Sequence, residues 1–171
     1  MTTALELRRL LAPLLSTSEC HLRIAVGDDP LVSPAHLLHA VVSAPDMPRG
    51  NFPAQSWPPT VEQVDKGLEP LVHSDDQILA LLVAACTEDL AYAVQVGPWT
   101  SDAAQPLLRQ AMHLLGRADW WSNCTLPSSC FDDGDFFDGV ERDPVTDHTF
   151  DSALIGIGEQ ATITFLAFAE D

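Results

Sequence analysis

The sequence predicts an α+β fold of about five helices packed on a small, mainly antiparallel sheet that includes a C-terminal β-hairpin. Apolar residues recur at helical spacing in several stretches before residue 116, and residues 21–26 alternate like a half-buried strand. Two β-rich runs, 150–157 and 161–169, end the chain, and the turn residues between them predict a hairpin. A chain of 171 residues with 46% hydrophobic residues is expected to form one globular domain, 1–171.

The first helix should begin at a capping box formed by Thr3 and Glu6, because leucines follow it at spacings of three and four. Pro13 has no backbone N–H and is expected to end this helix. The alternating strand 21–26 comes next, and the turn residues 27–30 should close it.

A short second helix should start at Ser33 and Pro34, an N-cap followed by proline at the first helical position. Residues 45–59 hold five prolines, so this segment is predicted to be a loop. Its aromatic residues Phe52 and Trp57 are expected to pin the loop onto the core. The alternative is a lid or a partner-docking loop.

Two further helices are predicted from capping boxes. Thr60 with Gln63 opens a weak helix that ends near residue 68. Ser74 with Gln77 opens the strongest helical stretch in the chain.

The end of that stretch is ambiguous, because residues 90–96 fit either a continued helix or a strand. Gly97-Pro98 then supplies a stop, and another helix is predicted over 106–115 with Gly116 as its C-cap. The helices on either side of the stop should form an antiparallel pair.

The last third of the chain combines an irregular segment with the hairpin. Residues 119–148 are predicted to be an irregular acidic segment. The final strand is apolar on both faces from Phe165 to Ala169, so it should lie inside the sheet and not at its edge.

Acid is concentrated towards the C-terminus. The chain has 25 acidic and 8 basic residues, a net charge of −17, and residues 132–171 hold eleven acids but one base, Arg142. Acid packed this densely must be solvated, bind cations or face a basic partner, because like charges repel one another. The same excess argues against direct binding to nucleic acid or to an anionic membrane, since both need Lys and Arg.

We therefore expect a non-catalytic acidic interaction or regulatory protein that binds a basic protein, because complementary charge speeds association and selects partners. The residues expected to contact the partner are acids of this segment: Asp132, Asp133, Asp135, Asp138, Glu141 and Asp143.

A small enzyme or ligand-binding domain is the alternative. Its pocket would lie between the helices and the C-terminal hairpin, lined by His113, Trp120, Trp121 and Trp57. A histidine, a carboxylate and a thiol near this point could form a nucleophilic set, although nothing in their spacing requires it: His113, Asp119 and Cys124. A third possibility is that the acidity serves only solubility or adaptation to high salt.

No cofactor is expected. Five residues separate Cys124 from Cys130, more than in the usual zinc clip, so free thiols are favoured over a metal site or a local disulfide. The run 132–139 fails the EF-hand pattern, because Asp138 stands where glycine is needed; a looser calcium or magnesium site stays open.

The sequence shows neither an export signal nor an apolar run of membrane-spanning length, so the protein is expected in the cytoplasm with its four cysteines reduced. The oligomeric state does not follow from the sequence.

Overall fold

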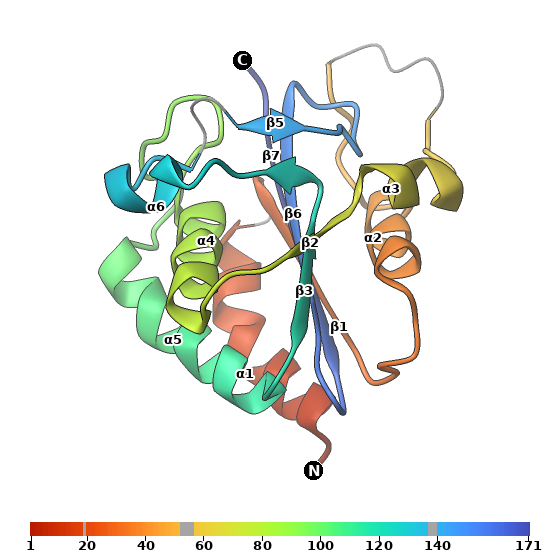
Figure 1. Ribbon diagram of the computed structural model, residues 1–171, viewed down its shortest axis with the longest axis vertical. Coiled ribbons are helices and arrows are strands. Elements are labelled where there is room, and N and C mark those ends of the chain that lie inside the picture. The colour runs from red at the N-terminus through yellow and green to blue at the C-terminus, as the bar shows by residue number, and fades with distance from the viewer. Residues whose placement is uncertain (19, 52–56, 137–139) are drawn as a thin grey trace.

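The computed structural model describes residues 1–18, 20–51, 57–136 and 140–171. It confirms the α+β prediction: helices cover both faces of an antiparallel sheet that includes the C-terminal hairpin (Figure 1). The helices are α1 (Thr3–Ser18), α2 (Pro34–Val42), α3 (Val61–Gly67), α4 (Asp75–Thr87), α5 (Ser101–Leu115) and the short α6 (Ser129–Asp133). The strands of the main sheet are β1 (Leu22–Gly27), β2 (Glu69–Leu71), β3 (Asp119–Ser122), β6 (Phe150–Ile157) and β7 (Thr162–Ala169).

The main sheet has the strand order β1-β7-β6-β3-β2, and every neighbouring pair is antiparallel. A separate two-stranded sheet pairs β4 (Cys124–Thr125) with β5 (Glu141–Arg142). Helices α1, α4 and α5 pack on one face of the main sheet and enclose the larger core. Helices α2 and α3 pack on the other face, where a second apolar cluster forms.

The hairpin and the buried position of the last strand are confirmed. All eight residues of β7 are buried between β1 and β6. The turn is closed by the Gly158 N–H, which donates to the Ala161 carbonyl over 2.9 Å.

The predicted end of the first helix is wrong, because α1 continues through Pro13 to Ser18. Pro13 is exposed, so water can hydrate the carbonyl that loses its helical donor. The Ser16 and Thr17 hydroxyls donate to the Pro13 carbonyl, and the buried stripe continues through Leu14. Burial of that stripe outweighs the missing hydrogen bond.

The predicted start of the helix at 106 is also wrong. Helix α5 begins at Ser101, because the Thr100 side chain caps it by accepting a hydrogen bond from the Ala103 N–H. Pro106 lies inside the first turns on the exposed side, where the proline ring is tolerated. Helices α4 and α5 pack side by side and run in opposite directions, as the stop between them predicts (Figure 1).

Residues 88–96 form neither the continued helix nor the strand. Helix α4 ends at Thr87, and Asp89 Oδ1 then accepts hydrogen bonds from the Ala91 and Tyr92 N–H groups. This turn leaves only an isolated bridge between Glu88 and Gln95. A short side-chain-bonded turn competes with both regular structures.

The prediction of an irregular segment at 119–148 is wrong in part. It contains β3, a strand of the main sheet, as well as β4, α6 and β5. The short β2, which pairs with β3, was also missed. None of the helices in the described ranges is long and apolar enough to cross a membrane.

Candidate functional site

The acids of the C-terminal segment divide into an inward and an outward set. Asp147 and Asp151 are buried, Glu170 is half-buried, and each accepts hydrogen bonds within the protein. The predicted partner residues that the structure describes are all exposed: Asp132, Asp133, Asp135, Glu141 and Asp143. Asp138 was predicted with them and lies outside the described residues.

Asp151 is part of a buried network that ties β6 to β3. Its Oδ2 accepts from the N–H groups of Val145 and Thr146 at 3.0 and 2.8 Å, and from the Thr146 hydroxyl at 2.8 Å. Its Oδ1 accepts from Asn123 Nδ2 at 2.7 Å, while Asn123 Oδ1 accepts from the Ala153 N–H. Burial raises the pKa of Asp151, and the hydrogen bonds lower it only part of the way back. The Asp151 carboxyl group therefore links β6 to Asn123, at the end of β3, and to the backbone of residues 145–146.

Asp147 anchors the start of the proline-rich loop. Its carboxylate accepts from Arg49 Nε at 2.6 Å and from the Gly50 N–H at 2.8 Å. Burial alone would raise the pKa of Asp147, but these two donors outweigh it and hold the pKa below its usual value. The backbone approaches so closely that a Cβ at Gly50 would overlap the Asp147 carbonyl.

Arg142, the one base among residues 132–171, is turned inward. Its Nε and Nη2 atoms are buried and have no hydrogen-bond partner in the part of the chain that the structure describes. Its guanidinium carbon lies 5.8 Å from the centre of the Phe150 ring. The exposed charge of this segment is therefore almost entirely negative. We call the exposed acids of α6, the turn after it and the β5 region the acidic surface (Asp132, Asp133, Asp135, Glu141 and Asp143).

The negative charge of the acidic surface affects a residue at the end of α4. The pKa of Glu88, at the end of α4, is raised by burial first and then by the negative charge of Asp135. The carboxylates of Glu88 and Asp135 therefore repel each other where α4 ends, and a cation placed there would offset this repulsion.

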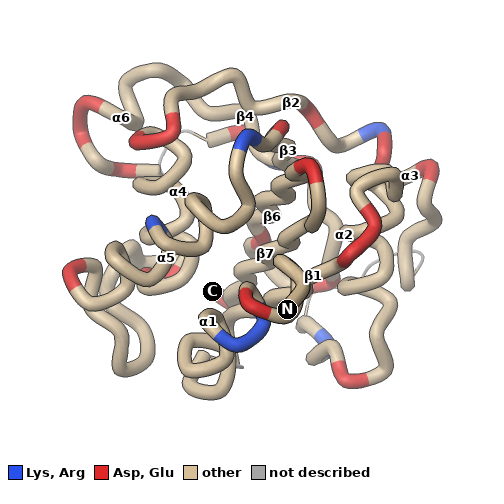
Figure 2. Tube along the Cα trace, turned by 90° about the horizontal axis from the view of Figure 1, so that it is seen from below, with Lys and Arg blue, Asp and Glu red and all other residues tan. Residues whose placement is uncertain are grey.

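The acidic surface is one part of a molecule that is acidic on several sides. In Figure 1, α6 and β5 lie at the end of the molecule from which the C-terminus emerges. Figure 2 shows further acidic residues around the trace, among them positions on α3 and on the loops at the molecule's edges. Charge alone therefore does not single out one face.

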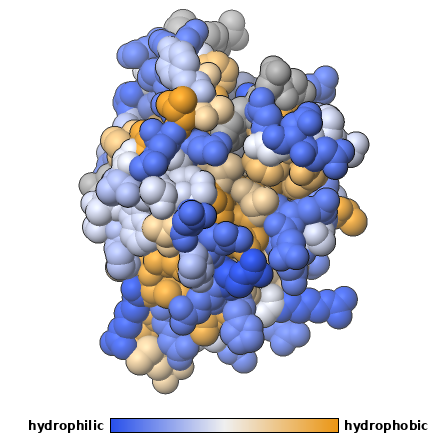
Figure 3. Space-filling model, turned by 90° about the vertical axis from the view of Figure 1, so that its left-hand side faces the viewer, coloured by the Kyte–Doolittle hydropathy of each residue, from blue (hydrophilic) through white to orange (hydrophobic). Residues whose placement is uncertain are grey.

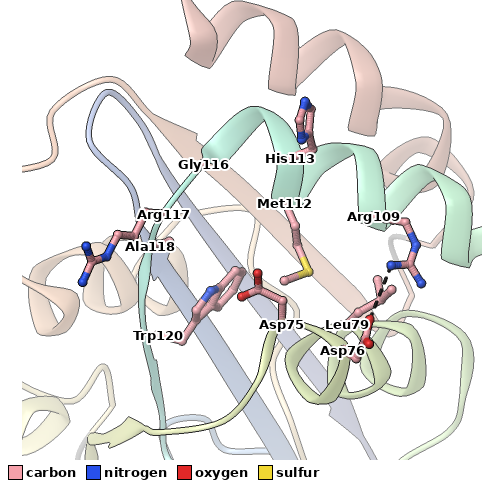
Figure 4. A pocket seen from close by; sticks show the side chains of 10 residues that line it. All are labelled: Asp75, Asp76, Leu79, Arg109, Met112, His113, Gly116, Arg117, Ala118 and Trp120. Atoms are coloured by element: carbon pink, nitrogen blue, oxygen red, sulfur yellow. Dashed lines mark hydrogen bonds and ion pairs between the residues drawn. The ribbon is translucent and has the colours of Figure 1, made fainter.

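The predicted pocket residues are brought together only in part. Trp120 and His113 line an open hollow of about 450 Å³ between α4, α5 and β3. In Figure 4, Trp120, Met112 and Asp75 point toward one another, whereas His113 projects from α5 away from them. Trp120 belongs to the larger core, and a Cβ at Gly156 would lie within 3 Å of its ring.

The other two predicted pocket residues lie elsewhere. Trp121 and Trp57 pack against the second apolar cluster, on the opposite face of the sheet from Trp120. For Trp121 this follows from strand alternation, because neighbouring residues of β3 send their side chains to opposite faces of the sheet. Arg49 lies 5.1 Å from the centre of the Trp57 ring, which places Trp57 beside the proline-rich loop anchor.

The hollow at Trp120 is the middle of three adjoining hollows along α4, which we call the α4 groove. On the side of β2, the middle hollow shares Asp75, Ala118 and Trp120 with a second hollow of about 410 Å³. On the side of α6, the middle hollow shares Asp76, Leu79 and Arg109 with a third hollow of about 390 Å³. Figure 3 views the side of the molecule that carries α4 and α5, and apolar residues show there between hydrophilic ones.

The candidate nucleophilic set is not assembled. The Cys124 thiol is buried and bonds to Asn123, Ser152 and the Asp151 carbonyl, with no histidine among the contacts described for it. Burial raises its pKa, which keeps the thiol protonated. Cys20, Cys86 and Cys124 are free thiols, and within the described ranges no group of three or more His, Cys, Asp or Glu side chains is placed to hold a metal ion.

Comparison of the chain with protein-family models, with curated proteins and with solved structures gives no match.

Sequence reasoning missed the groove and the buried network. Asp75 and Asp76 read as ordinary acids in the first turn of a helix, and their place beside Trp120 depends on the pairing of β2 with β3. Helix α4 is apolar nearly all round, a pattern that predicts a helix covered on most of its sides and gives no sign of a groove.

Proposed function

We propose that this protein is a non-catalytic acidic interaction protein that binds a basic partner protein, with the acidic surface as its recognition site. The single observation that carries this proposal is the inward orientation of Arg142. The only base in the acidic segment is half-buried, with its Nε and Nη2 atoms buried and its guanidinium 5.8 Å from the centre of the Phe150 ring, whereas five acids of the same segment are exposed.

The energetics favour a positively charged partner at this position. Asp135 raises the pKa of Glu88, which means that negative charges already repel one another where α6 approaches the end of α4. A lysine or arginine brought between them would replace repulsion with attraction, and the effect would weaken with salt.

The enzyme alternative has less support. Its thiol is buried with a raised pKa, His113 points away from Trp120 and Asp75, and Trp57 lies on the other face of the sheet. A nucleophile needs an adjacent base or a lowered pKa, and Cys124 has neither among the described contacts.

The test compares two variants of equal net charge with octalysine as the basic probe. In the first, the acidic surface is neutralised by replacing its five acids with the matching amides. In the second, five exposed acids elsewhere are replaced in the same way: Asp28, Asp46, Glu62, Asp102 and Glu159. Binding is measured by fluorescence anisotropy at low and at physiological salt.

The first variant should bind octalysine about tenfold more weakly than the wild type, if each lost charge is worth about 0.3 kcal/mol. The control should lose about twofold or less. Equal losses in both variants would show that only the net charge matters, which is the solubility interpretation, and the proposal would then fail.

A further inference from the structure

The α4 groove lies next to the acidic surface. Glu88 and Phe136 line its α6 end, and Asp135, in the turn beside Phe136, is close enough to raise the pKa of Glu88. The groove is therefore continuous with the acids proposed above to bind a basic partner.

The floor of the groove is apolar and belongs to helix surfaces. Leu79, Ala80 and Val83 of α4 line it, and Met112 and Trp120 complete it from α5 and β3. At the β2 end Val72, which is 89% exposed, adds an apolar side chain to the groove wall.

The rim of the groove is charged, with acids in excess. The acids that line it are Asp75, Asp76, Glu88 and Asp119, against the two arginines Arg109 and Arg117. Arg109 reaches across the groove from α5 to Asp76 on α4, with 3.4 Å between the charged atoms. Both side chains of this pair are largely exposed, at 58% and 86%, so an incoming cation can replace Arg109 at small cost.

The main sheet offers a partner little room to add a strand. At the β1 edge, Arg8 donates to the Val26 carbonyl and Arg23 donates to the Leu22 carbonyl, so side chains already occupy part of the open backbone. At the other edge β2 has three residues, one of which is Pro70.

We infer that the α4 groove binds an amphipathic basic helix of the partner protein, an inference that rests on the proposed function. An extended peptide laid between α4 and α5 would lose water from its backbone without gaining hydrogen-bond partners, whereas a helix satisfies its backbone internally. Helix α4 has 13 residues and is about 20 Å long, which matches a partner helix of about 13 residues. Its apolar face would cover Ala80 and Val83, and its Lys or Arg residues would meet Asp75, Asp76 and Glu88.

The experiment uses a synthetic 18-residue peptide of leucine and lysine with leucines at helical spacing. The control peptide has the same composition in an order that leaves no apolar face. Ala80→Arg places bulk and positive charge in the groove, and Ala12→Arg makes the same change at an exposed position of α1 as the matched control. Arg109→Gln removes the side chain that competes for Asp76. Binding is measured by calorimetry, and helix formation in the peptide by circular dichroism.

The amphipathic peptide should gain helicity on binding and should bind about tenfold more tightly than its scrambled control. Ala80→Arg should weaken binding about tenfold and Ala12→Arg about twofold or less. Arg109→Gln should tighten binding by about two- to threefold, a change in the opposite direction that a misfolded variant could not produce.

Unchanged binding in both groove variants would overturn the inference, and so would equal binding of the two peptides or binding without helix formation. The proposed function would survive such a result if neutralising the acidic surface still weakened binding of octalysine about tenfold. If that neutralisation has no effect while the groove variants act as expected, the proposed function fails. A concentration-dependent dimer that Ala80→Arg dissociates would instead make the groove an interface between copies of this chain, which also overturns the inference.

Discussion

His148 Nδ1 lies 2.8 Å from Glu170 Oε1, and this pair fastens the start of the proline-rich loop to the end of the last strand. His148 Nε2 lies 3.0 Å from the Pro48 carbonyl, which can only accept a hydrogen bond. Both ring nitrogens of His148 therefore face oxygen acceptors. Glu170 Oε1 also accepts from the Asn51 N–H, which draws the loop toward the strand. The buried ring stacks on Phe168.

Glu170→Gln should destabilise the protein by about 1 to 2 kcal/mol at neutral pH, because it removes the charged acceptor of these bonds. Burial alone would raise the pKa of Glu170, but its donors outweigh burial and hold the pKa below its usual value. A carboxyl group with a depressed pKa stabilises the folded state above its unfolded pKa and loses that contribution as the pH falls through its folded pKa. The difference between wild type and variant in urea unfolding should therefore shrink below about pH 4. A difference that stays constant from pH 7 to pH 3 would contradict the role of the charge.

Asn123→Asp should be more destabilising than Asn123→Ala at pH 8, and the gap should close toward pH 5. Asn123→Ala leaves a donor and an acceptor without partners at the Ala153 N–H and at Asp151 Oδ1, a cost of about 2 to 4 kcal/mol. Asn123→Asp adds a second buried carboxylate beside Asp151, whose pKa burial already raises. The folded state then binds more protons than the unfolded state, so stability rises as the pH falls. Equal pH profiles for the two variants in chemical denaturation would show that the site is not sensitive to charge.

Only Cys20 should react with a thiol reagent in the native protein. Cys20 is exposed, whereas Cys86, Cys124 and Cys130 are buried. Burial also raises the pKa of Cys86 and of Cys124, which keeps both thiols protonated. With Ellman's reagent one thiol per molecule should react quickly, and all four should react in guanidinium. Cys20→Ser should leave no fast-reacting thiol, and any remaining fast reaction would place another cysteine at the surface.

The fold class followed from local patterns, whereas the groove did not. Capping boxes at Thr60 and Ser74 marked the starts of α3 and α4 because they are satisfied within four residues of chain. The strand β3 could not be read in the same way. Its four residues gain their partners from β2 and β6, about 50 residues before it and about 35 after it.

The difference between local patterns and long-range contacts also decides which features of the candidate site the sequence could predict. The exposure of Asp132 and Asp133 was expected from their charge alone. The inward orientation of Arg142 and the packing of Trp57 on the same apolar cluster as Trp121 depend on long-range contacts. Sequence patterns predict which residues meet solvent more reliably than which residues meet each other.

Gly156→Ala tests whether the packing of Trp120 against β6 holds the floor of the α4 groove in place. A Cβ at Gly156 would lie 2.8 Å from the Trp120 ring, closer than van der Waals contact allows. The ring is 6% exposed and lies among the larger core, so it cannot move aside freely. We expect a loss of about 1 to 3 kcal/mol in urea unfolding, the usual cost of overpacking. Trp120→Phe makes room for the new methyl group, so the double variant should be more stable than the sum of the two single losses predicts by at least about 0.5 kcal/mol. If the losses of unfolding free energy in the two single variants were strictly additive in the double variant, Gly156 and Trp120 would not be in tight contact. Packing against β6 would then not be what positions the indole in the groove.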